Sequence, residues 1–117
     1  MTKTELSDQV RGRSIAFSWT EGPATDSTCI HAFHDDGTVQ WHSLESGAAS
    51  QRPPYLGVRI DDDLCLVSYL SQSGYTLTVV LDFIEQSLTG VASNDKCWYP
   101  VRGRFQVLTT ASESESG

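Results

Sequence analysis

Histidine and tyrosine side chains are the groups in this sequence best suited to chemistry. His31 stands between Cys29 and Phe33 in a run that alternates apolar and polar residues, and Tyr75 and Tyr99 occur in similar runs. A histidine buried among aromatic rings is held neutral and can act as a base or a hydrogen-bond donor. We predict His31, Tyr75 and Tyr99 as candidate catalytic residues for proton transfer. The alternative is that their rings only complete a core.

Other chemistries find less support in the sequence. The three cysteines, Cys29, Cys65 and Cys97, are widely spaced and form no Cys-x-x-Cys pair, which is typical of reduced thiols. A zinc site needs three or four ligands on one face, and Cys29 and His31 supply only two. The sequence contains no Gly-x-Ser-x-Gly motif. We expect no metal, no cofactor, no disulfide, and neither a serine nor a cysteine hydrolase.

Short strands must position these residues. Eight runs with a period of two can be counted, at about residues 13–19, 27–34, 38–45, 55–60, 63–71, 75–83, 87–93 and 99–108. Their short connections are typical of antiparallel hairpins. A flat meander leaves two open edges, whereas a barrel leaves none. We predict an all-β fold: a single eight-stranded antiparallel up-and-down barrel, preceded by a short N-terminal helical turn in which Leu6 and Val10 share a face.

The first well-marked hairpin determines which way His31 points. A three-residue turn that ends with Gly37 in the left-handed region would set Phe33 against Val39 and His31 against Trp41. This register divides the two strands cleanly into an apolar and a polar face. We therefore predict that His31 points into the barrel.

The same facing test is applied to the next hairpin, with the four residues 71–74 taken as its turn. We predict that Tyr75, Leu77, Val79 and Leu81 face inward together with Leu64, Leu66, Ser68 and Leu70. The outer face of these two strands would then carry Cys65, Val67, Tyr69 and Val80, which is more apolar than a fully solvated face. This outer strip is a candidate contact with a second subunit.

Composition limits the size of the fold and its partners. The 117 residues allow one domain, which we divide into an N-terminal extension (1–11), the barrel (12–108) and a disordered tail (109–117). A net charge of −7 disfavours nucleic acid and anionic membrane surfaces. The first residues lack the apolar segment of a secretory signal. We expect a cytoplasmic protein whose partner is a small organic ligand or substrate, and which could form a homodimer.

The strand and turn residues resemble those of a known family. Residues 33–41 (FHDDGTVQW), 63–70 (DLCLVSYL) and 75–83 (YTLTVVLDF) are similar to the small calycin-type domain of MoaF-like proteins. Such domains are similar to lipocalins and, more remotely, to phenolic acid decarboxylases, which transfer a proton inside a β-barrel without a cofactor. The resemblance implies one calycin-like barrel, over about residues 12–108, that holds a single small molecule.

Inward-facing rings and aliphatic side chains make up the predicted binding site. Aromatic rings favour a flat, apolar ligand. Arg52 lies in the long connection 45–54, a candidate lid, and could meet an anionic group at the mouth. The predicted ligand-binding residues are Phe17, Trp19, Phe33, Trp41, Arg52, Leu66, Leu77 and Phe105.

Three functions are compatible with this site. The first is binding of a small, apolar, aromatic or conjugated molecule in the barrel. The second is a cofactor-free lyase, isomerase or cyclase in which His31 or a tyrosine moves a proton. The third is a non-catalytic interaction module with a filled barrel and a dimer surface on its outer strip.

Overall fold

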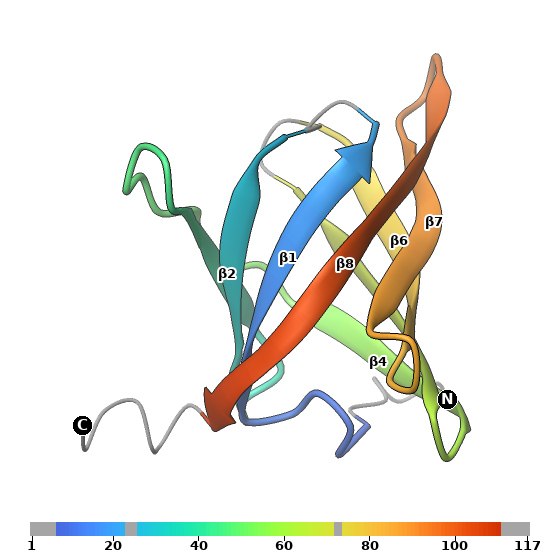
Figure 1. Cartoon of the computed structure of the whole chain (residues 1–117). Coiled ribbons are helices and arrows are strands. Elements are labelled where there is room, and N and C mark those ends of the chain that lie inside the picture. Colours follow the sequence, from blue (N-terminus) through green and yellow to red (C-terminus); the bar gives the residue numbers. More distant parts are fainter. Residues whose placement is uncertain (1–6, 23–25, 72–73, 111–117) are drawn as a thin grey trace, which may run out of the picture.

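A single sheet makes up the whole fold. The computed structural model describes residues 7–22, 26–71 and 74–110, and Figure 1 shows its strands. Every hydrogen-bonded pair of strands is antiparallel, and their order in the sheet is β3-β2-β1-β8-β7-β6-β5-β4. The eight strands are β1 (Arg13–Glu21), β2 (Thr28–Phe33), β3 (Val39–Ser43), β4 (Tyr55–Asp61), β5 (Leu64–Leu70), β6 (Thr76–Asp82), β7 (Ser87–Ser93) and β8 (Trp98–Thr110).

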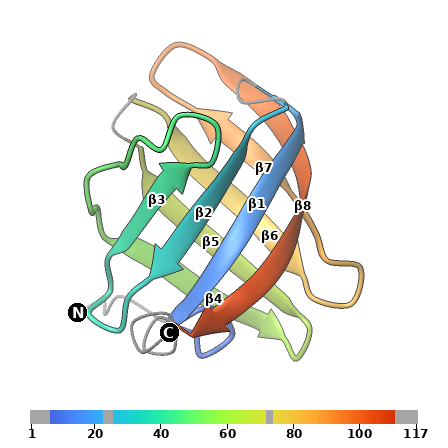
Figure 2. The same ribbon diagram turned by 60° about the vertical axis from the view of Figure 1, so that its left-hand side comes forward.

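The sheet is strongly curled into an open half-barrel. In Figure 2 the strands β3, β2, β1 and β8 lie in front of the other four and cross them at an angle. β3 and β4 are the two edges, and no strand ladder joins them. The chain just before β4 instead runs beside β3, where Val39 N donates to Pro53 O (2.9 Å) and Ser50 N donates to Trp41 O (2.8 Å). The all-β antiparallel prediction is confirmed, and the sheet is less closed than predicted.

Two glycines allow the sheet to curl. A Cβ atom on Gly90 of β7 would overlap the Thr78 carbonyl oxygen of β6, and a Cβ on Gly103 of β8 would overlap the Ser18 carbonyl oxygen of β1. Glycine at such positions lets neighbouring strands coil more tightly than any side chain would permit. The curl that creates an interior therefore depends on these two positions.

The inner face of β1, β2 and β3 agrees with the prediction. Phe33 pairs with Val39 and His31 pairs with Trp41, and Gly37 has a positive φ of 90°. His31 is 1 % exposed. The three-residue turn is closed by His34 N, which donates to Thr38 O (2.9 Å). His31 therefore points inward, as predicted.

The facing predicted for β5 is wrong. Cys65, Val67 and Tyr69 are buried, whereas Leu70 is 65 % exposed and Leu66 lies on the outer face with it. The ladder pairs Cys65 with Leu81, Val67 with Val79 and Tyr69 with Leu77. The predicted ligand-binding role of Leu66 and the predicted outer strip therefore both lose their basis.

The length of one turn explains this error. Ser71 N donates to Tyr75 O (2.8 Å), which leaves three residues between them, and Gly74 has a positive φ of 97°. The prediction placed four residues in this turn. Because the side-chain period of a strand is two, a slip of one residue moves every side chain of β5 to the other face.

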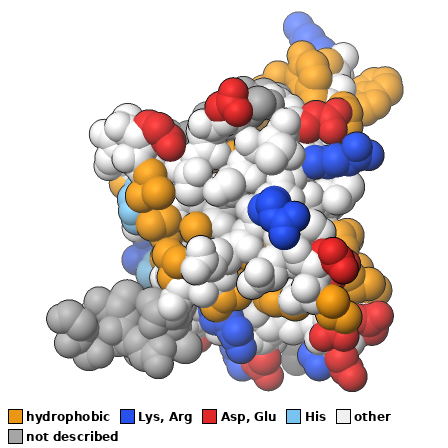
Figure 3. Space-filling view, viewed as in Figure 1, with side chains coloured by type: hydrophobic (Ala, Val, Ile, Leu, Met, Phe, Trp, Pro, Cys, Tyr) orange, Lys and Arg blue, Asp and Glu red, His pale blue; other side chains and the backbone are white. Residues whose placement is uncertain are grey.

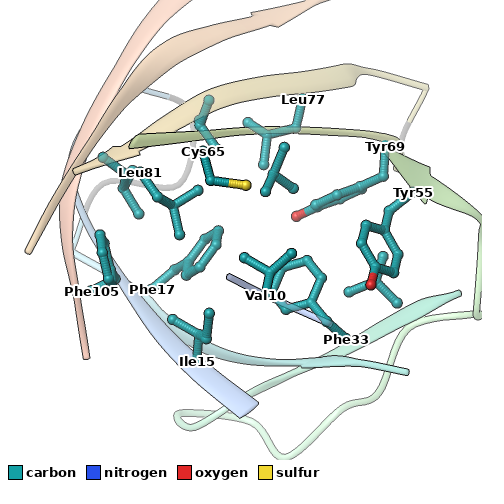
Figure 4. Close-up of a cluster of buried hydrophobic side chains, with 14 of the residues drawn as sticks. Val10, Ile15, Phe17, Phe33, Tyr55, Cys65, Tyr69, Leu77, Leu81 and Phe105 are labelled. Carbon is teal, nitrogen blue, oxygen red and sulfur yellow. The ribbon is translucent and has the colours of Figure 1, made fainter. Parts of the chain in front are cut away.

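One half of the curled interior is filled. Figure 4 shows phenylalanine rings and aliphatic side chains from both layers packed against one another. The largest fully buried members are Tyr55, Phe17, Phe33, Ile15, Leu81 and Leu88. These side chains leave no room for a ligand in this half.

The segment before β1 closes the filled end. Val10 is fully buried, and Ser7 N donates to Gly57 O (2.8 Å). The side chain of Gln9 donates to the carbonyl oxygens of Asp61 and Asp62 (2.9 and 3.1 Å). Residues 8–12 form hydrogen-bonded turns and not the predicted helical turn, and no helix is present in the described ranges. Leu6 and residues 111–117, part of the predicted tail, lie outside those ranges.

None of the three described ranges contains a helix long and apolar enough to cross a membrane.

Candidate functional site

A cavity of about 170 Å³ occupies the other half of the interior. It opens at the end of the sheet where β1 finishes and the β7–β8 hairpin begins its turn, the upper end in Figure 1. The lining residues are Trp19, Glu21, Cys29, His31, Trp41, Tyr69, Ser71, Tyr75, Leu77, Ala92 and Val101. They come from β1, β2, β3, β5, β6, β7 and β8 and from the turn after β5, so the curl of the sheet brings distant parts of the chain together.

A buried hydrogen bond forms the floor of this cavity. Nε2 of His31 on β2 lies 2.7 Å from the Tyr69 hydroxyl on β5, although these strands are not neighbours in the sheet. Nδ1 of His31 lies 3.3 Å from the carbonyl oxygen of Cys29. A carbonyl oxygen only accepts, so Nδ1 carries the proton and Nε2 accepts the hydrogen of Tyr69. The bond therefore runs from Tyr69 to His31.

Burial keeps both groups neutral. Desolvation lowers the pKa of His31 to about 3, against the smaller raising effect of its hydrogen bond to Cys29 O. Desolvation also raises the pKa of Tyr69 far above its ordinary value. Charging either group would cost hydration that the interior does not replace. At neutral pH the floor therefore presents an uncharged imidazole and an uncharged phenol.

Aromatic rings surround this hydrogen bond. The imidazole of His31 stacks on Phe17, with ring centroids 4.0 Å apart and planes at 24°. On its other side Trp41 lies 5.7 Å from His31 and 4.7 Å from Tyr69. Trp19 meets Phe17 edge to face at 5.8 Å. The floor and walls of the cavity are thus largely made of rings.

The rim carries the polar groups. The Tyr75 hydroxyl lies 3.9 Å from Cys97 Sγ, and this hydrogen bond, followed by burial, raises the pKa of Tyr75 to about 12. The carboxylate of Glu21 lies 3.6 Å from the Arg102 guanidinium, and both side chains are about half exposed or more. The rim thus offers a hydroxyl and a carboxylate to anything entering the cavity.

The hairpin beside the rim exposes apolar surface. Trp98 is 73 % exposed and Tyr99 is 41 % exposed. Figure 3 shows hydrophobic side chains at the upper right, over the tip of the β7–β8 hairpin. Tyr99 packs on Tyr75, with ring centroids 6.0 Å apart, but does not line the cavity. The candidate catalytic role predicted for Tyr99 therefore has no direct geometric support.

Comparison with known proteins identifies the family. The family model described as the MoaF N-terminal domain matches residues 2–96. The chain belongs to the MoaF N-terminal domain family. No curated protein matches the chain.

One solved structure shares the fold of this MoaF-family chain. It is a protein from Burkholderia vietnamiensis solved as "a putative beta-lactamase", with 12% sequence identity and a TM-score of 0.69. The similarity covers 92% of this chain and 100% of that chain. At this identity the likeness establishes the fold alone.

Some of the site residues predicted from the sequence line the cavity. Five of them line it: Trp19, His31, Trp41, Tyr75 and Leu77. Phe17, Phe33 and Phe105 are buried, but in the filled half of this MoaF-family fold.

Arg52 has a different role from the one predicted. Its guanidinium lies 3.2 Å from a carboxylate oxygen of Asp36 and 3.1 Å from Thr38 Oγ1. It is absent from the lining of the cavity. The Arg52 guanidinium, which was predicted to meet an anionic group at the mouth, instead forms an exposed ion pair with the β2–β3 turn.

Sequence reasoning did not place the other six lining residues in the site, and Tyr69, which forms the floor with His31, is the most consequential of them. It was assigned to the outer face by the wrong turn length. The glycine at position 74 follows two polar residues, just as Gly37 follows Asp35 and Asp36. Giving both turns three residues would have placed Tyr69 inside, opposite Leu77.

Within residues 7–22, 26–71 and 74–110, no three His, Cys, Asp or Glu side chains gather closely enough to hold a metal ion.

Proposed function

We propose that this MoaF-family protein binds a small aromatic molecule with a single ring in the cavity at the open end of the sheet. The observation that carries the proposal is a ring-lined hollow of about 170 Å³ in an otherwise filled interior. An apolar cavity of about 150 Å³ is large enough for benzene. The volume therefore fits one ring with a short substituent and is too small for a fatty acid or a fused polycyclic ligand.

Closure of the half-barrel is part of this proposal. The chain at residues 48–54 lies beside β3, with Ser43 N donating to Ala48 O (3.0 Å) and with isolated bridges between Thr38 and Pro54 and between His42 and Ala49. We infer that this segment closes the gap between β3 and β4, so that the sheet works as a calycin-like barrel. A ligand in the cavity would then be enclosed on all sides except the mouth.

The chemistry of the floor supports binding over proton transfer. A histidine with a pKa of about 3 is a weak base, and Tyr69 with a raised pKa is a weak acid. Efficient acid–base catalysts have pKa values near the working pH. The floor is therefore better suited to orient a ring than to move a proton, and turnover is an outcome that the binding experiment can also detect.

Isothermal titration calorimetry with benzyl alcohol tests the proposal. We expect a dissociation constant of roughly 0.1–1 mM, which is ordinary for a ligand with so few atoms. Ala92→Phe should abolish binding because Ala92 lines the cavity and a phenyl ring would fill it. Val91→Phe is the matched control, since the adjacent Val91 is 39 % exposed on the outer face.

The outcome depends on comparing the two variants. Thermal unfolding should show that both are folded. Leu77→Ala, which enlarges the cavity, should in addition admit 2-naphthol, a two-ring probe. Equal binding by Ala92→Phe and the unaltered protein, or the absence of binding by the unaltered protein, would overturn the proposal.

A further inference from the structure

We infer, on the basis of the proposed function, that the ligand carries a protonated amine next to its ring. Among the described residues that line the cavity, Glu21 is the only one with a charged side chain. Its side chain is 47% exposed, and it lines the cavity together with Trp19 and Tyr75. The preferred ligand is thus an arylalkylammonium ion with its ring inside and its nitrogen at the mouth.

The charges at the cavity favour a cation over an anion. Within the described part of the chain, neither lysine nor arginine lines the cavity. Arg102, the partner of Glu21 at 3.6 Å, is 65% exposed and stays outside the lining. A carboxylate ligand would lose its hydration beside the Glu21 carboxylate and would find no positive group in the described lining, whereas an ammonium would meet that carboxylate. The net charge of −7 also attracts cations to the protein as a whole.

The floor adds a hydrogen-bond acceptor. The hydrogen of the Tyr69 hydroxyl is donated to Nε2 of His31, so the Tyr69 oxygen offers its lone pairs. Figure 4 shows this hydroxyl pointing toward the interior. A ligand group on the far side of the ring is therefore favoured when it donates a hydrogen bond, as a phenol does.

The rings that line the cavity suit the same ligand. A cation within about 6 Å of a tryptophan or tyrosine ring is attracted by the ring face, and the attraction grows when water is excluded. Trp19, Trp41 and Tyr75 all line the cavity. An ammonium at the rim would therefore be held by Glu21 and by aromatic rings together.

Three probes of nearly equal size test the inference. We expect calorimetry at pH 7 to show benzylamine, which is protonated at this pH, binding at least 5-fold more tightly than neutral benzyl alcohol. Benzoate should bind at least 5-fold more weakly than benzyl alcohol.

Two charge variants identify the responsible group. Glu21→Gln should remove the preference for benzylamine over benzyl alcohol, because it removes the carboxylate from the cavity lining. Glu85→Gln changes the net charge equally, but Glu85 lies in the exposed β6–β7 turn, so all three affinities should stay the same. Arg102→Gln should strengthen benzylamine binding about 2-fold, because it removes the competing cation, whereas structural damage would weaken it.

The results separate this inference from the proposed function. If benzyl alcohol binds but benzylamine binds no better, or if Glu21→Gln keeps the preference, the ammonium inference is wrong and the proposed function stands. If none of the three probes binds the unaltered protein, both are wrong.

Discussion

The two ends of the curled sheet differ in what fills them. At one end Phe33, Val39 and Leu81 are fully buried, and Val10 seals the opening. At the other end the rings of Trp19 and Trp41 line the cavity. Both ends are built from the same eight strands with the same alternation of side chains. Side-chain shape and one short covering segment therefore decide which half is core and which is cavity.

His31 stands at the boundary between these two halves. One face of its ring stacks on Phe17 of the core, and its Nε2 meets Tyr69 at the floor of the cavity. The residue thus belongs to the packing of one half and to the polar chemistry of the other. Its substitution should affect both halves.

Removing a ring from the filled half should give the largest effect. Phe33 is fully buried and lies 5.0 Å from the ring of Tyr55. Phe33→Ala is expected to lower the free energy of unfolding by about 3–5 kcal/mol, because it leaves a cavity that the neighbours cannot fill. Urea denaturation measures this change. Leu70→Ala, at an exposed position on the outer face, should change it by less than about 0.5 kcal/mol; comparable losses would mean that this half is not tightly packed.

Acidification should weaken the fold through His31. In the unfolded chain its pKa is about 6.5, and in the folded protein it is lowered to about 3 by burial. Between these values the unfolded state binds the extra proton, so stability is fully present above pH 6.5 and falls as the pH decreases toward 3. The loss through this residue should reach about 2 kcal/mol by pH 5.

Urea denaturation at pH 7.5 and pH 5 measures this loss. His31→Phe keeps a ring in the stack and should lose most of the pH dependence. His34→Gln, at a half-buried position in the β2–β3 turn, should keep it. An unchanged pH dependence in His31→Phe would contradict the buried, neutral state of the imidazole.

Breaking the hydrogen bond at the cavity floor should have a smaller effect. Tyr69→Phe leaves Nε2 of His31 without a donor, and an unsatisfied buried group of this kind costs about 1–3 kcal/mol of unfolding free energy. Tyr99→Phe is the matched control, since Tyr99 is 41 % exposed and should change the stability little. Equal effects in the two variants would show that the floor is not held by this bond.

The smallest effect is expected at Arg52. Its ion pair with Asp36 is exposed on both sides. Arg52→Gln should lower the free energy of unfolding by less than about 1 kcal/mol, because exposed ion pairs contribute little. Calorimetry should show unchanged affinity for benzyl alcohol. Loss of binding in this variant would restore the predicted role of Arg52 at the mouth of the cavity.

Clear alternation made the inward and outward faces of β2 and β3 predictable. In β2 and β3 the polar Gln40 and His42 separate the apolar Val39 and Trp41, and an Asp-Gly pair marks the turn. Only one register sorts these residues into an apolar and a polar face. The inward position of His31 could therefore be predicted from the sequence.

Alternation failed where both faces of a strand are apolar. Leu64, Cys65, Leu66 and Val67 are consecutive, so either set can be taken as the inner one. The length of the following turn then decides, and the wrong length put Tyr69 outside. The partner of His31 could not be found without the correct register.

The cavity itself could not be predicted either. The depth of a hollow depends on how tightly the sheet curls at Gly90 and Gly103 and on how far Val10 reaches into the opposite end. Both depend on contacts between segments that lie far apart in the sequence. Residue types alone do not determine such contacts.

The two glycine turns that end at Gly37 and Gly74 constrain how this family can vary. Each closes a connection of three residues with a positive φ. One inserted or deleted residue in either connection would exchange the inner and outer sets of a whole strand, and would carry Tyr69 or His31 into solvent. Relatives that keep the cavity are therefore expected to differ in length at these two hairpins by even numbers of residues. The lengths of other loops are expected to vary without this restriction.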